Sequence, residues 1–284
     1  MKIKKIPKIF YTIFSIFCIL ILWQIASNFL SSMILPSVKI TIQKLIEIFK
    51  DEKLTGMIFI TLGRLFTGLL LGVVIGVFSG VLMGRFETVN RIFLPIIGIL
   101  QTVPPVSWLI LALIWLGFNG KPAIFILTIT IIPIIAINIS QGFKSIDQGL
   151  MEMATVYNFS NLKIFFNIIK PSVMPYFKSG CLTGLGIGWK IVVMGEVLTT
   201  TNGIGGMIQN ARLNVEIETV MAWSIIILFL FYISRWLLEK IFSIRDAYNF
   251  TSRGVGKPFG RGGRPFFTRS APGWHAPGPA PLIW

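Results

Sequence analysis

The chain has 284 residues, of which 54% are hydrophobic and only 13% are charged. Soluble domains average about 25% charged residues, so this composition excludes an ordinary soluble domain and indicates an integral membrane protein. The formal net charge is +15, but most basic residues lie beside apolar stretches, a pattern typical of membrane topology. We therefore expect contact with the lipid bilayer and no nucleic acid as a partner.

Apolar stretches long enough to cross a bilayer, roughly 20 residues each, recur along the chain. The first follows the basic start Met1–Lys8. It is longer than the apolar core of a usual signal peptide, so we predict an uncleaved first span. The fold class predicted is all-α integral membrane with six transmembrane helices, at residues 9–30, 62–84, 96–117, 122–141, 179–198 and 219–238.

Lysine and arginine are unevenly shared between the loops that join these spans. They are frequent before the first span, at 85–91, at 142–178 and after the last span, whereas 118–121 and 199–217 hold few. Because basic residues mark the cytoplasmic side, the bias places both termini in the cytoplasm of a multi-pass protein of the cell inner membrane. The first external loop, 31–56, is an exception with four lysines that acidic neighbours partly offset.

The C-terminal tail differs in composition from the rest of the chain. Residues 251–284 are rich in Gly, Pro and Arg and contain no Asp or Glu, so we predict that they are disordered. The abrupt change favours a foreign or frameshifted coding sequence, with a basic RNA-binding tail as the alternative. The predicted domains are an N-terminal span with the first external loop (1–56), a membrane domain (57–240) and a cytosolic C-terminus (241–284).

A polar segment, LMEMATVYNFSNLKIFFNIIKPSVMPY, interrupts the apolar chain at residues 150–176. Either Ser145 or Asp147 can cap a helix over 147–157. Asn158 follows the last residue of that apolar periodicity. Asparagine adopts the left-handed conformation more easily than other non-glycine residues, so we predict that the helix ends there.

A second short helix is expected at 161–169, before Pro171. Proline disfavours helix at the residue before it, so we expect the chain to turn back towards the bilayer at this point. Periodicity alone leaves two readings open. The segment is either an ordinary loop between two spans or a pair of amphipathic helices on the cytosolic membrane surface.

The polar segment resembles the EAA loop of ABC-transporter permeases, whose pattern is E-A-A-x3-G-x9-I-x-L-P. Met153, Asn158 and Lys170 depart from the pattern but keep its spacing. The positions that the resemblance identifies as an ATPase-coupling loop are Glu152, Met153, Ala154, Asn158, Ile168 and Pro171.

Further fragments extend the resemblance over roughly 58–238. They are similar to permeases of the subfamily that handles nitrate, taurine and aliphatic sulfonates, and they imply a type I ABC importer permease core. The fragments are Thr61-Leu-Gly-Arg64, Gln101-Thr-Val-Pro-Pro-Val-Ser-Trp108, Gly195-Glu196-Val197 and Thr201-Asn-Gly-Ile-Gly205.

The resemblance implies a function in transport rather than in enzyme catalysis. The chain would be the permease subunit of a binding-protein-dependent importer of a small anionic solute, coupled through residues 142–178 to a separate pair of cytosolic ATP-binding subunits. An extracytoplasmic solute-binding protein and a second copy of the permease, as a homodimer, are the other implied partners. The chain carries no G-x-x-x-x-G-K-[ST] phosphate loop, so we expect no cofactor of its own and ATP bound only by the partner. Glu152 would meet a basic residue of the ATPase, or is simply a solvated carboxylate.

Several residues within the spans are candidates for the translocation path. Pro104 and Pro105 break the third span and either border the path or produce a plain kink. Lys190 and Glu196 are ionisable residues in the fifth span, where such groups are functional candidates. Lys190 can favour an anion, snorkel or pair, and Arg64 is expected to snorkel or to be paired.

The glycines of the second span recur at every fourth position, a spacing that indicates close helix packing. A secondary transporter is the alternative function, but such transporters usually carry symmetric repeats and coupling carboxylates near the membrane midplane. A membrane-embedded enzyme is a third reading. It lacks a metal-spaced or nucleophile-centred cluster in this sequence.

Overall fold

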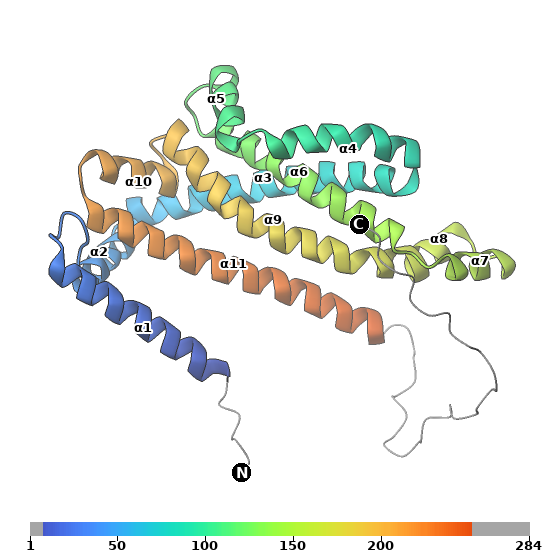
Figure 1. Cartoon of the computed structure of the whole chain (residues 1–284), viewed down its shortest axis with the longest axis horizontal. Helices are drawn as coiled ribbons and strands as arrows, with labels where there is room; N and C mark the ends of the chain where they lie inside the picture. The colour runs from blue at the N-terminus through green and yellow to red at the C-terminus, as the bar shows by residue number, and fades with distance from the viewer. Residues whose placement is uncertain (1–7, 252–284) are drawn as a thin grey trace, which may run out of the picture. The chain divides into compact units, whose positions relative to one another are not determined.

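The computed structural model describes residues 8–251, and every regular element in this range is helical. The predicted all-α class is therefore confirmed. Most of the predicted tail, 252–284, lies outside the described residues. The elements are α1 (Lys8–Phe29), α2 (Val38–Lys50), α3 (Glu52–Arg85), α4 (Glu87–Thr102), α5 (Pro105–Leu116), α6 (Lys121–Lys144), α7 (Gln148–Val156), α8 (Asn161–Ile164), the π-helical turn η1 (Phe165–Ile169), α9 (Lys170–Thr199), α10 (Gly203–Leu213) and α11 (Ile217–Thr251) (Figure 1).

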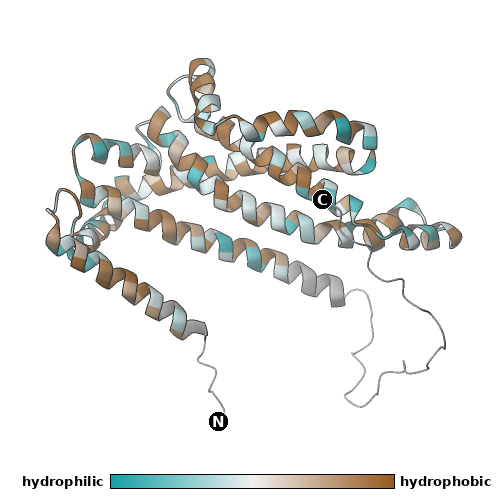
Figure 2. Cartoon of the chain, in the orientation of Figure 1, coloured by the Kyte–Doolittle hydropathy of each residue, from teal (hydrophilic) through white to brown (hydrophobic). Residues whose placement is uncertain are grey.

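Four stretches of the described chain are long and apolar enough to cross a membrane: Glu52–Arg85, Lys121–Lys144, Asn161–Thr199 and Ile217–Ser243. The pair α4 and α5 makes a fifth if it is counted as one broken span. The apolar helix Phe14–Phe29 within α1 is shorter than these, so the total of six spans stays a prediction. Hydrophobic residues are frequent along the long helices (Figure 2).

Helices α3 and α6 pack together along most of their length because α3 presents glycine at every fourth position. A Cβ atom added to Gly72, Gly76 or Gly80 would lie 2.6–2.7 Å from the Cβ atom of an isoleucine on α6. Such distances are too short for any side chain, so only glycine permits this approach. The predicted packing role of these glycines is confirmed.

Helix α6 also packs against α9, which in turn contacts α11. Gly184 and Gly188 of α9 face Ile131 and Leu127 of α6. On the α11 side, the indole N–H of Trp189 donates a hydrogen bond of 3.0 Å to the hydroxyl of Ser234. Together with Trp223 of α11, which is fully buried, these contacts join α3, α6, α9 and α11 in one apolar core.

The third predicted span is broken at the expected place. Helix α4 ends at Thr102, and α5 begins at Pro105 after a bend of 90°. Val103 is extended because it precedes Pro104, which is the conformation that proline imposes on its neighbour. Pro105 then starts the new helix, where its missing N–H costs nothing. The helix that contains the start of the predicted span, residue 96, already begins at Glu87.

The second helix of the polar segment is not a separate element. Helix α8, η1 and α9 run on as one helix, Asn161–Thr199, which passes as a single span of 39 residues. The expected turn at Pro171 was therefore wrong. The residue before it, Lys170, has helical dihedral angles, and its N–H reaches back to the carbonyl of Phe165. This wider π turn lets the helix continue into a residue that has no N–H to donate.

At 1.5 Å per residue this helix is about 58 Å long, whereas the hydrocarbon core of a bilayer is about 30 Å thick. One or both of its ends therefore extend beyond the apolar layer. Helix α7 lies at its N-terminal end, which α8 forms, and α10 follows its C-terminal end (Figure 1). The two groups of candidate residues are thus held at opposite ends of α9.

Candidate functional site

Helix α7 has well-defined signals at both of its ends. Of the two predicted caps the structure uses Asp147, whose side chain accepts a hydrogen bond of 2.8 Å from the N–H of Gly149. At the other end Asn158 has a φ of 48°, so its predicted left-handed conformation is confirmed. The N–H of Phe159 bonds the carbonyl of Ala154, and that of Asn158 bonds the carbonyl of Thr155. This pair of bonds is the Schellman motif, which ends a helix sharply.

Large apolar side chains are exposed on and directly after helix α7, although this helix of nine residues is too short to span a membrane. The exposed fractions are 42% for Met153, 77% for Val156 and 70% for Tyr157, the residue that follows α7. Glu152 is also exposed. Contiguous apolar surface of this kind, rimmed by polar residues, marks interaction sites.

The six positions of the EAA-like pattern divide into an exposed and a buried set. Ala154 is fully buried and Ile168 is 5% exposed. Ala154 is therefore not on the surface offered to a partner, although the EAA-like pattern includes it, because its methyl group packs inside this chain. Glu152, Met153, Asn158 and Pro171 are exposed.

A buried polar cluster lies near the other end of α9. Glu196 is fully buried, and one of its carboxylate oxygens accepts a hydrogen bond of 2.7 Å from the guanidinium of Arg64 on α3. The other oxygen accepts bonds from the Thr61 hydroxyl, at 2.8 Å, and from the Gly205 N–H, at 2.9 Å. Arg64 also donates to the carbonyl of Asn202. Of the two readings of Arg64, pairing is therefore the one that the structure supports.

The cluster caps the N-terminus of α10 with side chains from two other helices. The first N–H groups of a helix have no partner inside it and must find acceptors elsewhere. Here Ile204 N–H donates to the Thr61 hydroxyl at 2.8 Å, next to the bond between Gly205 and Glu196. Gly203 has a φ of 89°, and any Cβ atom there would collide with the Glu196 carboxylate. The result is one hydrogen-bonded unit that ties α3, α9 and α10 together.

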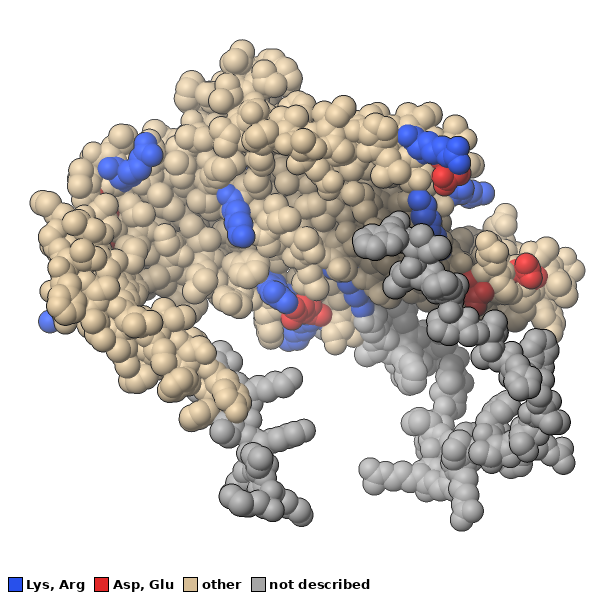
Figure 3. Space-filling model, in the orientation of Figure 1, with Lys and Arg blue, Asp and Glu red and all other residues tan. Residues whose placement is uncertain are grey.

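The candidate path residues lie in different surroundings. Glu196 has both oxygens occupied and faces no open path in this conformation. Lys190 is exposed and lines a cavity of about 330 Å³ between α9 and α11, together with Ser224. Pro104 and Pro105 are exposed at the bend between α4 and α5. In Figure 3 the surface over the middle of the bundle is mostly uncharged, so charged residues there stand out.

Three fragments that the sequence presents separately meet in this cluster. They are the Thr61–Arg64 turn of helix, Glu196 and the Gly203–Gly205 start of α10. The sequence offered one signal, which is that Glu196 and Arg64 both lie within predicted spans. Their spacing along the chain does not indicate that they pair.

Comparisons with known proteins identify the family. The profile of the family described as binding-protein-dependent transport system inner membrane component matches residues 72–243, more than half of the chain. The chain belongs to this family. The taurine transport system permease protein TauC of Escherichia coli (strain K12) is 30% identical over 206 residues, which cover 70% of this chain and 75% of that protein. The nitrate import permease protein NrtB of Synechocystis sp. is 31% identical over 213 residues, which cover 72% and 78%.

The fold is shared with solved transporters. A structure of the MetNI methionine ABC transporter in an inward-facing conformation matches with a TM-score of 0.56 at 18% identity, covering 68% of this chain and 98% of that one. This likeness confirms the type I ABC importer permease core. Membership of the family makes this chain a membrane-spanning permease subunit of a binding-protein-dependent ABC importer, which is not an enzyme and works with an ATPase and a substrate-binding protein. The family decides against the alternative of a secondary transporter.

Proposed function

We propose that this permease forms the translocation path for a small anionic solute of the sulfonate, nitrate or taurine class. The proposal is supported first by its relatives, whose names describe transport of taurine and import of nitrate. The observation that carries it within this chain is Lys190. Its ammonium group has no hydrogen bond or ion pair in the described part of the chain, and it lies beside a cavity in the middle of a span.

The cavity beside Lys190 fits a small solute with a charged end. Its walls are mostly apolar, from Trp189, Val193, Ile227 and Phe231, while Lys190 and Ser224 supply polar groups. A lone ammonium in an apolar layer is costly unless an anion or water meets it. An anionic solute that passes along α9 supplies that partner, and a neutral solute does not.

We further propose that α7 is the element that docks on a separate pair of ATP-binding subunits, which supply ATP binding. Met153, Val156 and Tyr157 would fill an apolar groove on the ATPase, and Glu152 would meet a basic residue at its edge. Asn158 ends α7 sharply, and Ile168 and Pro171 position the helix that follows. In this view Ala154 acts from inside, by holding α7 against the rest of the loop.

The remaining parts of the proposal concern assembly and topology. One coupling loop per chain and two ATPase subunits require two permease copies, so we propose a homodimer. Basic residues before residue 9, near α7 and after residue 239 favour the cytoplasm for the 142–178 loop and for both termini. The permease domain would occupy 57–240, between the N-terminal segment 1–56 and the C-terminal segment 241–284.

Charge reversal on α7 tests the coupling role. In Glu152→Lys the new ammonium faces the basic residue expected on the ATPase, and like charges across an interface cost several kcal/mol. Met153→Asp places a charge in the apolar contact. Both variants should insert normally, since both side chains are exposed, but lose ATPase association in pull-down and solute-stimulated ATP hydrolysis. Glu47→Lys, an exposed carboxylate on α2, is the matched control and should behave as the wild type.

The anion proposal is tested separately at Lys190. Lys190→Gln should lower the uptake of nitrate or of a small sulfonate by about tenfold, the effect of losing one charge-assisted contact. Lys190→Arg keeps the charge and should retain most of the uptake. Equal uptake by the wild type and Lys190→Gln would show that the ammonium does not serve the solute.

A further inference from the structure

A cavity of about 640 Å³ lies between the candidate coupling loop and the ends of two spans. Arg85, the last residue of α3, and Phe143, near the end of α6, form one side of it. Met151 of α7, with Asn161 and Phe165 from the start of the following helix, forms the other. The cavity thus separates the loop from the membrane-spanning body, and whatever occupies it touches both.

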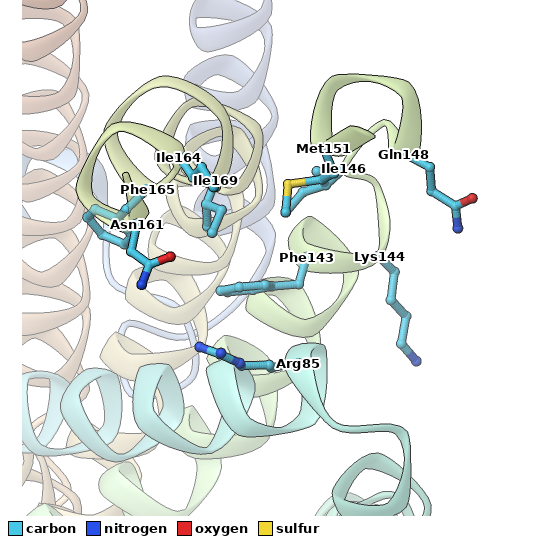
Figure 4. Close-up of a pocket in the computed structure, with 10 residues that line it drawn as sticks. All are labelled: Arg85, Phe143, Lys144, Ile146, Gln148, Met151, Asn161, Ile164, Phe165 and Ile169. Carbon is cyan, nitrogen blue, oxygen red and sulfur yellow. The ribbon is translucent and has the colours of Figure 1, made fainter. Parts of the chain in front are cut away.

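Arg85 supplies a positive charge to the cavity. Figure 4 shows its guanidinium pointing inwards, below the ring of Phe143 and towards the side-chain amide of Asn161. Its one described contact is with the ring of Phe86, 5.7 Å from the guanidinium carbon, and no ion pair with a described carboxylate is present. None of the residues lining this cavity is acidic. Five N–H donors in a fixed fork are therefore available to an anion, and a guanidinium suits phosphate or sulfonate oxygens best.

The rest of the lining is mostly apolar. The ring of Phe143 lies over the guanidinium, and Met151, Ile164, Phe165 and Ile169 line the side formed by α7 and the helix that follows it (Figure 4). Lys144 also lines the cavity, but its chain points outwards at the rim, so it adds charge at the entrance (Figure 4). A small hydrated anion gains nothing from such walls, whereas an anion that carries hydrocarbon gains from both parts.

The position of the cavity agrees with an amphiphilic anion. Arg85 and Lys144 are the last residues of α3 and α6 and follow the apolar stretches 62–84 and 122–141, so we place them where these spans leave the apolar layer. Phospholipid phosphates lie at this level, and basic pockets between spans on the cytoplasmic side attract anionic headgroups. The acyl chains can then run down beside the spans.

We propose that this cavity binds the phosphate of an anionic phospholipid, with Arg85 as its principal ligand, Asn161 as a second donor and Lys144 at the entrance. The bound lipid bridges the ends of α3 and α6 to α7 and α8. It would therefore fix the position of α7, and the lipid composition of the membrane would influence coupling to the ATPase. The inference relies on the proposed topology for the cytoplasmic position of the cavity, and on the proposed coupling role of α7 for that last consequence.

Lipid retention by the purified full-length chain, alone and in complex with its ATPase, tests the site directly. The probes are phosphatidylglycerol and phosphatidylcholine in mixed detergent micelles, with bound lipid counted by native mass spectrometry. We expect the wild type to retain phosphatidylglycerol, and Arg85→Gln to retain about tenfold less because a charge-assisted, forked contact is lost. Arg85→Lys, which keeps only a point charge, should fall between them.

Arg91→Gln is the matched control. It removes the same charge nearby, but Arg91 is paired with Glu87 at 3.3 Å and does not line the cavity. Retention that falls equally in Arg85→Gln and Arg91→Gln would reflect general surface charge and would overturn the site. Inorganic phosphate that protects the wild type but not Arg85→Gln against thermal unfolding, without phosphatidylglycerol doing so, would identify a free anion and overturn the lipid assignment.

The last arm separates this inference from the proposed function. If Arg85→Gln loses ATPase association while its lipid retention is unchanged, the cavity receives an acidic side chain of the ATPase and the lipid site is refuted. If Glu152→Lys abolishes coupling but leaves lipid retention unchanged, the two proposals stand independently. A loss of lipid by Arg85→Gln together with intact Glu152→Lys coupling would refute only the coupling role of α7.

Discussion

Replacing Glu196 by alanine removes the centre of the buried cluster. The carboxylate accepts hydrogen bonds from the Arg64 guanidinium, the Thr61 hydroxyl and the Gly205 N–H, at 2.7, 2.8 and 2.9 Å. In Glu196→Ala the Gly205 N–H loses its acceptor in a buried place, and Arg64 loses its charge partner. We therefore expect the tie between α3, α9 and α10 to be lost and the whole bundle to unfold at a lower temperature.

The magnitude follows from these contacts. Removing one partner of a buried ion pair costs about 3–5 kcal/mol, because the other charge stays buried. The cost of leaving Arg64 unpaired is at the lower end of this range, because its side chain is 12% exposed and keeps its bond to the Asn202 carbonyl. An unsatisfied buried N–H adds about 1–3 kcal/mol. A total of about 4 kcal/mol lowers the melting temperature by about 8–16 °C at 2–4 °C per kcal/mol.

The measurement is thermal unfolding of the detergent-solubilised protein, followed by its tryptophan fluorescence, to which the buried residues Trp189 and Trp223 contribute. Glu196→Gln keeps an acceptor oxygen and should lose about half as much stability. Glu152→Ala, which removes an exposed carboxylate, is the control and should melt like the wild type. If Glu196→Ala also melts like the wild type, the cluster does not hold α10, and the reasoning from its hydrogen bonds is refuted.

Three further predictions follow, two from local geometry and one from the proposed topology. Gly76→Ala should lose about 1–3 kcal/mol of stability, because its Cβ atom would lie 2.7 Å from that of Ile135 and force α3 and α6 apart. Gly63→Ala, which has open space, should be neutral or stabilising, and equal melting of the two variants would contradict the packing. Val215→Gly should raise the stability by about 1 kcal/mol in the same assay, since Val215 has a φ of 60° that a β-branched residue adopts only with strain; a lower melting temperature would show that no strain is present. On a cysteine-free background, an impermeant thiol reagent applied from outside should label Leu213→Cys but not Gln148→Cys, and the reverse pattern would invert the proposed topology.

The features that the sequence could predict depend on short-range rules. The glycine spacing of α3 predicts close packing because every fourth residue lies on one face of a helix. The caps of α7 and its end at Asn158 follow from side chains that act within a few residues of themselves. The break at Pro104 and Pro105 follows from the missing N–H groups. Each of these predictions was confirmed.

The features that it could not predict depend on contacts between distant segments. Nothing in the spacing of Thr61, Arg64 and Glu196 shows that they meet, because the packing of α3 on α6 and of α6 on α9 decides it. The burial of Ala154 is likewise set by neighbours that the helical periodicity of α7 does not reveal. The turn expected at Pro171 was wrong for a related reason. The π turn before Pro171 changes which carbonyl groups need a donor, and the rule that proline disfavours helix at the preceding residue does not take such a turn into account.

The three departures from the EAA pattern become intelligible in physical terms. Met153 is exposed on α7, where a long, flexible apolar side chain can serve a partner surface as well as alanine can. Asn158 has the φ of 48° that the pattern's glycine would supply, at a modest cost. Lys170 places its ammonium 5.2 Å from the centre of the Phe166 ring, so its charge is accommodated without burial in the core. This chain therefore keeps the physical features of the pattern although some of its residues differ. These features are an exposed apolar face on α7, a residue in the left-handed conformation that ends the helix, and a following helix that continues through a proline.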